Sequence, residues 1–194
     1  MRRLQEQRQA LFFRLQDDSA SACAQLSACL TLAEQWAGVS QEPVAVPCME
    51  EAVLSFLRSC EVLTSDWKQM LEHAANAPEP ENFLAYTPAL DQEIRLFTMD
   101  MLYRYYLRAA YAETPEAEIL PLQMAAFAVC VVLLYSRRLG FHTAEQRLRI
   151  WQLFVKEIEY DGDNLEELEW QLETNAAFSP AAFRAYFASP GGVQ

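Results

Sequence analysis

The residues of this chain that most readily suggest chemistry form an acidic segment at positions 154–172, FVKEIEYDGDNLEELEWQL. Seven acidic residues surround a single glycine between Glu157 and Glu169. Carboxylates at this density can bind a hard cation, but Asp, Gly and Asn also form tight turns between helices. An EF-hand calcium loop is excluded, because neither the register from Asp161 nor the one from Glu159 places glycine sixth and glutamate twelfth.

The stretch Asp161 to Asn164, DGDN, is therefore interpreted as a tight turn between two helices. Glycine or asparagine supplies a residue with positive φ, and Asp163 or Asn164 caps a helix that begins at Leu165. Acidic side chains in the first turn also interact favourably with the helix dipole. A recognition or cation-binding role for these carboxylates is the alternative.

The sequence contains few other residues that could form a metal or catalytic site. Two histidines, His73 and His142, are too few for a di-metal carboxylate bundle, and no glutamate precedes either by three residues. The sequence has no GxGxxG, GxxxxGK[ST] or GxSxG motif. We therefore predict no metal site, and the residues alone identify no cofactor site and no catalytic residue.

The five cysteines are odd in number and include no CxxC pair, so we expect free thiols in a reducing cytoplasm. At least three of them lie on predicted apolar helix faces, where a free thiol behaves as a small buried apolar group. The cysteines are Cys23, Cys29, Cys48, Cys60 and Cys130.

Four tyrosines, Tyr103, Tyr105, Tyr106 and Tyr111, lie on one long predicted helix. Tyrosines at this spacing are typical of packing residues that keep a hydroxyl in water. The alternative is a cleft among them that binds a ligand such as S-adenosylmethionine.

The charge of the chain limits its partners. A net charge of -12 and a pI of about 4.6 would repel a phosphate backbone, so we predict no nucleic-acid partner.

The most apolar run, Met124 to Tyr135, is shorter than the roughly 20 residues that cross a bilayer. We therefore predict no membrane span, no export and a cytoplasmic location.

The hydrophobic periodicity predicts an all-α fold, an irregular bundle of about eight or nine helices around a buried central helix. Residues 1–188 are expected to form a single domain, with sub-lobes 1–74 and 81–188 on either side of a proline-rich break, and 189–194 a disordered tail. Helix-start signals place Pro88 in the first turn of a helix to about Tyr111 that packs on both sides.

The helix that precedes the acidic segment has clear boundary signals. Thr143-Ala144-Glu145-Gln146 fits a capping box, and Gly140 ends the helix before it. The predicted core stripe of this helix is Leu148, Trp151, Phe154 or Val155, and Ile158.

Three segments, in order, are similar to the flagellin lysine-N-methylase family. Residues 156–166, KEIEYDGDNLE, resemble its "REIEH, acidic turn, NLE" pattern, residues 81–86, ENFLAY, resemble "ENYLVY", and residues 8–30 resemble a helical pair of the family. Tyr160 stands where the family usually has histidine. The resulting candidate functional surface is Glu81, Asn82, Tyr86, Glu157, Glu159, Asp161, Asp163 and Asn164.

The resemblance implies methyl transfer to flagellin lysines from S-adenosylmethionine, together with a cysteine-rich N-terminal module that holds an iron–sulfur cluster. This chain has no clustered cysteines, so it corresponds to the helical part alone, either a piece of a longer protein or a short relative. The expected function is to support a lysine-methylating module or to present its substrate, without activity of this chain alone. The expected partner is that module or a flagellin-like protein.

The alternative function is that of a stand-alone helical interaction module. Its partner surface would consist of the acidic helix Leu165 to Glu173 and the region of Tyr86.

Overall fold

The computed structural model describes residues 1–39, 48–78, 86–111 and 114–188, and this part of the chain contains nine α-helices and no β-strand. The predicted all-α fold is therefore confirmed. The α-helices are α1 (Arg2–Leu15), α2 (Ala22–Ala37), α3 (Met49–Ser59), α4 (Ser65–Asn76), α5 (Pro88–Tyr105), α6 (Leu120–Leu139), α7 (Ala144–Phe154), α8 (Gly162–Thr174) and α9 (Pro180–Ala188). Glu81, Asn82 and the tail 189–194 lie outside the described residues.

Four short elements connect or extend these helices. They are the 3-10 helices η1 (Tyr106–Tyr111), η2 (Pro115–Glu118) and η4 (Ala176–Phe178), and the π-helical turn η3 (Val155–Glu159), which follows α7 without a break.

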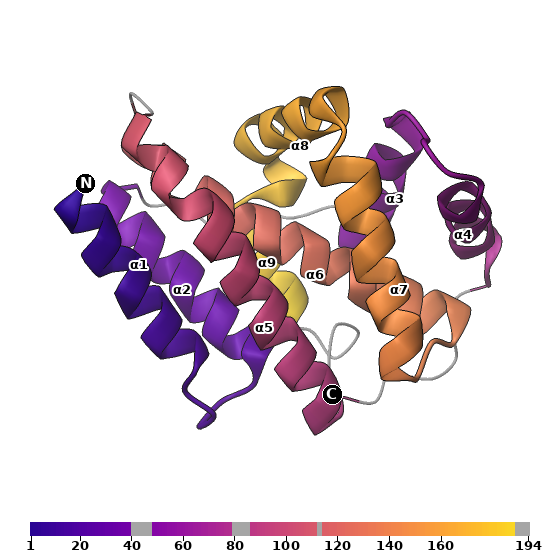
Figure 1. Ribbon diagram of the computed structural model, residues 1–194, viewed down its shortest axis with the longest axis horizontal. Coiled ribbons are helices and arrows are strands. Elements are labelled where there is room, and N and C mark those ends of the chain that lie inside the picture. Colours follow the sequence, from indigo (N-terminus) through magenta and orange to yellow (C-terminus); the bar gives the residue numbers. More distant parts are fainter. Residues whose placement is uncertain (40–47, 79–85, 112–113, 189–194) are drawn as a thin grey trace.

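Helix α6 is the predicted central helix, and every residue from Pro121 to Ser136 is buried. Helices α2, α3, α4, α5, α7, α8 and α9 all contact it, and in Figure 1 it passes behind α5 and α7. Its Phe127 ring packs edge-on against Phe56 and Phe178, with ring centroids 5.3 and 5.2 Å away. Such edge-to-face pairs contribute about 0.5–1.5 kcal/mol each beyond the burial of their area.

The helix has the expected bounds, but its apolar stretch extends beyond the run Met124 to Tyr135. The stretch Glu116–Leu139 is long and apolar enough to cross a membrane by length and composition, but 89% of its most apolar part is buried in the protein. Such burial is typical of the core helix of a bundle, whereas a helix in lipid exposes its apolar side chains.

The helix boundaries near the acidic segment follow local sequence signals closely, with one exception. Gly140 adopts the left-handed conformation (φ 66°) at the end of α6, and Thr143 and Gln146 form the predicted capping box of α7. The predicted start of α8 at Leu165 was wrong. The helix begins at Gly162, Asp161 caps it through the backbone N–H of Asn164, and Gly162 has no positive φ.

One prediction about an apolar face was also wrong. Leu148 is 53% exposed, because Arg147 occupies the buried position beside it and its charge is compensated by Glu93 at 2.7 and 2.8 Å. Helix α5 packs against α1 and α2 as well as α6, although its Leu96 is 58% exposed. The helical run of α5 also stops at Tyr105 and continues as the 3-10 helix η1.

Candidate functional site

The acidic segment fixes the loop between α3 and α4 to the start of α8. Glu157, in the π-helical turn, is fully buried, and its carboxylate accepts hydrogen bonds from the backbone N–H of Leu63 at 2.7 Å and from the hydroxyl of Thr64. Buried carboxylates are stable only when such donors replace water. The role of Glu157 in this arrangement is therefore structural.

Asn164 completes the same connection. Its side-chain oxygen accepts from the backbone N–H of Glu61 at 2.9 Å, and its amide group donates to the carbonyls of Glu61 and Glu157 at 2.8 Å each. The side chain is buried and uses both its donors and its acceptor. We call Glu157, Asn164 and the loop they hold, residues 61–64, the acidic-turn clamp.

The remaining acids of the segment have separate positions. Asp161 is the cap of α8, whereas Asp163 and Tyr160 are exposed. Glu159 faces the end of α5, where it pairs with Arg104 and accepts a hydrogen bond from the Tyr105 hydroxyl at 2.8 Å. Burial, followed by this hydrogen bond and the charge of Glu159, raises the pKa of Tyr105 well above its usual value.

The other predicted site residue that the structure describes, Tyr86, lies far from the acidic segment. Its half-buried hydroxyl donates to Asp91 at 2.6 Å near the N-terminal end of α5. Helix α8 lies near the other end of α5, where Arg108 contacts Glu169. The 18 residues of α5 span about 27 Å, so the structure does not combine Tyr86 and α8 in one partner surface.

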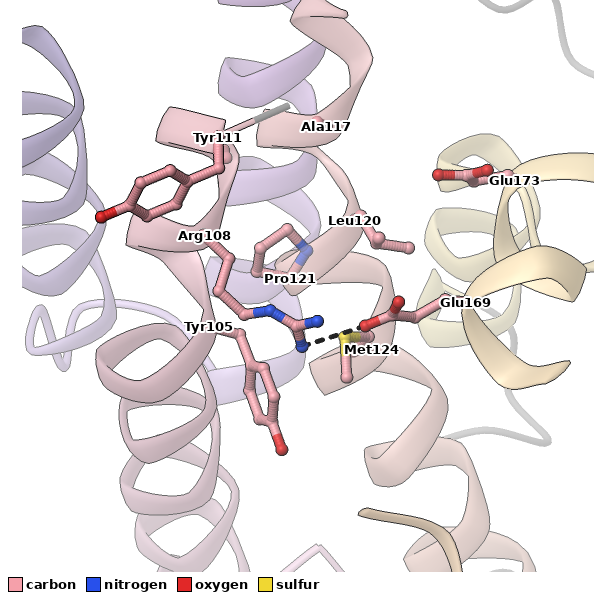
Figure 2. Close-up of a pocket in the computed structure, with 10 residues that line it drawn as sticks. Tyr105, Arg108, Tyr111, Ala117, Leu120, Pro121, Met124, Glu169 and Glu173 are labelled. Carbon is pink, nitrogen blue, oxygen red and sulfur yellow. Dashed lines mark hydrogen bonds and ion pairs between the residues drawn. The ribbon is translucent and has the colours of Figure 1, made fainter. Parts of the chain in front are cut away.

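A cleft with a volume of about 310 Å³ lies between η1, the start of α6 and α8 (Figure 2). Leu120, Pro121 and Met124 of α6 form its apolar floor, and Glu169 and Glu173 of α8 form its far wall. The tyrosine-rich helix and the acidic helix, which the sequence indicated separately, therefore meet at this cleft. Its volume is at the lower limit of pockets that bind small molecules.

The four tyrosines of the long helix do not line the cleft together. Tyr106 is fully buried in the core, and Tyr103 lies on the surface beside Arg8, whose guanidinium carbon is 5.6 Å from its ring centre. Only Tyr105 and Tyr111 line the cleft, and Figure 2 shows the Tyr111 side chain directed away from Glu169. We therefore assign no S-adenosylmethionine site to these tyrosines.

Opposite charges cross the cleft at one point. Arg108 of η1 reaches Glu169 at 3.1 Å, and its guanidinium lies 5.5 Å from the ring centre of Tyr105 (Figure 2). Glu173 lies one turn further along α8, is exposed, and has no partner among the described residues. The cleft thus combines an apolar floor, an ion pair and one unpaired carboxylate.

The described residues do not fit an iron–sulfur cluster. They contain no group of three or more His, Cys, Asp or Glu side chains placed to hold a metal ion. Four of the five thiols are buried, and burial raises the pKa of Cys23, Cys29 and Cys60 to about 12. A cluster ligand is a thiolate, which these environments disfavour.

No family model, curated protein or solved structure matches this chain. The resemblance to flagellin lysine-N-methylases therefore depends on the three sequence segments alone.

The cleft was only partly predictable from the sequence. Glu173 belongs to the acidic helix that was named as a partner surface, and Tyr105 and Tyr111 were named as candidate ligand residues. No sequence pattern indicated Arg108 or the floor residues as part of a site. The ion pair of Arg108 with Glu169 joins residues 61 positions apart, so it depends on how η1 and α8 pack.

Proposed function

We propose that this chain is a helical domain, similar to the helical part of flagellin lysine-N-methylases, that supports a protein-lysine methylation module or presents its substrate. The observation that supports this proposal is the cleft between η1, α6 and α8, because its chemistry suits a lysine side chain. The methyl donor S-adenosylmethionine and the iron–sulfur cluster then belong to a cysteine-rich module, with which this domain acts in the cytoplasm.

A lysine side chain has an apolar four-carbon stem and a compact ammonium group at its end. Leu120, Pro121 and Met124 provide an apolar surface for the stem. Glu173 provides an unpaired carboxylate for the ammonium group, and the nearby ring of Tyr105 favours a cation. A flagellin-like protein that displays an exposed lysine is the proposed partner.

The guanidinium of Arg108 occupies part of the same cleft, in the position that a substrate cation would take. Its guanidinium pairs with Glu169 and lies over Tyr105, so it neutralises one of the two carboxylates on the far wall. Removal of Arg108 would leave both Glu169 and Glu173 available to a ligand cation. We therefore expect Arg108 to weaken lysine binding in the wild-type domain.

The test is a titration of the isotope-labelled domain with a short uncharged peptide that carries one central lysine, followed by NMR chemical shifts. We expect shifts at the cleft, none with a norleucine peptide, about tenfold weaker binding in Glu173→Gln, and tighter binding in Arg108→Gln. Glu167→Gln is the matched control, because it removes the same charge from α8 at a residue that does not line the cleft.

Equal binding of the lysine and norleucine peptides would refute lysine recognition. So would an equal loss of affinity in Glu173→Gln and Glu167→Gln, because that result would reflect net charge alone.

The alternative is a stand-alone interaction module that uses the same cleft without a methylating partner. The exposed position of Glu166 and the cleft position of Glu169 on α8 favour a protein contact there. Charge reversal at both residues should then abolish capture of a flagellin-like protein in a pull-down. Unchanged capture would contradict this function.

A further inference from the structure

A second concave surface lies between α5 and α7, on the side of α6 that these two helices cover. It has a volume of about 440 Å³ and is lined by apolar side chains and three carboxylates. We call it the α5–α7 groove. Its lining residues are Glu93, Leu96, Phe97, Asp100, Ala144, Glu145, Leu148 and Trp151.

The floor of the groove is aromatic and its edges are aliphatic. The rings of Phe97 and Trp151 stack with their centres 3.8 Å apart and an interplanar angle of 21°. Leu96 on α5 and Leu148 on α7 are 58% and 53% exposed. The buried indole N–H of Trp151 has no hydrogen-bond partner within the described parts of the chain. Two exposed leucines over an aromatic floor form an apolar strip that water covers at a free-energy cost.

The rim of the groove is acidic. Glu93, Asp100 and Glu145 line it, and among the described residues no lysine or arginine does. Glu93 pairs with Arg147, and Asp100 pairs with Arg104. Neither arginine lines the groove. Glu145 has no partner among the residues the structure describes. The unpaired carboxylate of Glu145, together with the net charge of -12 of the chain, therefore favours a cationic occupant.

We propose that the α5–α7 groove docks an amphipathic helix of another protein, with apolar side chains on one face and lysine or arginine beside them. The apolar strip between two helices suits the apolar face of a third helix, the usual helix-in-groove mode of recognition. The acidic rim selects basic flanking residues. A second copy of this chain is disfavoured, because each copy has a net charge of -12.

This groove is separate from the cleft that was proposed to bind lysine. The cluster of Arg104, Tyr105 and Glu159 lies between them, since Arg104 pairs with Asp100 at the groove while Tyr105 lines the cleft. The docking proposal is therefore independent of the lysine proposal.

The test uses fluorescence anisotropy with a labelled helical peptide of about 16 residues, with leucine on one face and lysine on its flanks. Wild type should bind it, and Leu148→Glu should bind at least about tenfold more weakly. Phe13→Glu is the matched control, because it makes the same charge change at an exposed residue of α1, 78% exposed, outside the groove. A peptide with glutamate in place of lysine should not bind.

Any of three results would overturn the docking proposal. Failure of wild type to bind the lysine peptide would show that the groove does not recognise this chemistry. An equal loss in Leu148→Glu and Phe13→Glu would assign the binding to net charge. A loss in Glu173→Gln without one in Leu148→Glu would place the peptide in the lysine cleft instead. Leu96→Glu repeats the test from α5, and unchanged circular dichroism confirms that each variant is folded.

Discussion

Replacement of Asn164 by alanine tests whether the acidic-turn clamp stabilises the fold. The substitution removes three hydrogen bonds, to the N–H and carbonyl of Glu61 and to the carbonyl of Glu157. At about 1 kcal/mol of net stability for each bond, the free energy of unfolding should fall by about 3 kcal/mol. For a chain of this length the melting temperature should fall by about 6–12 °C.

Urea unfolding followed by circular dichroism measures this change directly. The control is Asp163→Ala, next to Asn164 in the first turn of α8 but exposed, where loss of the dipole interaction should cost less than about 1 kcal/mol. The free energy of unfolding of Asn164→Ala could instead lie within about 0.5 kcal/mol of the wild-type value, or equal that of Asp163→Ala. In that case the buried hydrogen bonds do not hold α8 to the loop, and the structural role of the clamp is refuted.

Three further predictions follow from burial and electrostatics. At pH 8, a thiol reagent should label native protein rapidly at one cysteine only, the exposed Cys48, because the other four are buried with raised thiol pKa values; rapid labelling of more than one would contradict the packing. Burial alone would raise the pKa of Asp91, but hydrogen bonds from the Tyr86 hydroxyl, the Ala22 amide and Arg95 hold this pKa below its ordinary value. The stability this carboxylate contributes is present above its unfolded pKa and is lost as pH falls, so the stability difference between wild type and Asp91→Asn should shrink in urea titrations below pH 4. Leu134→Ala should lower the free energy of unfolding by about 2–5 kcal/mol, whereas Leu148→Ala should change it by less than about 0.5 kcal/mol; similar losses in both would place Leu148 in the core.

Local signals in the sequence were sufficient to predict most of the fold. The capping box at Thr143, the glycine after α6 and the apolar run of α6 each depend on residues within one or two turns, and each was confirmed. The all-α class follows from the same kind of signal, because hydrophobic periodicity reports the face that a helix buries.

Predictions failed where a long-range contact decided the outcome. Periodicity assigned Leu148 to the core, but the buried position belongs to Arg147, whose charge is compensated by Glu93 from α5. The sequence of α7 alone does not contain that partner. The start of α8 was misplaced for a related reason, since Asn164 is used to bind the backbone of Glu61 from 103 residues away and Asp161 caps the helix instead.

The difference between residues explained by structural contacts and residues free of them determines how the resemblance to lysine-N-methylases should be tested. Its clearest segment, residues 156–166, contains Glu157 and Asn164, which have structural partners that account for their residue types. A fold requirement alone would therefore preserve this pattern, with or without a role in methylation. Glu173 and Arg108 of the cleft lie outside that segment. Binding experiments on these two residues therefore test the proposed function independently of the similarity that suggested it.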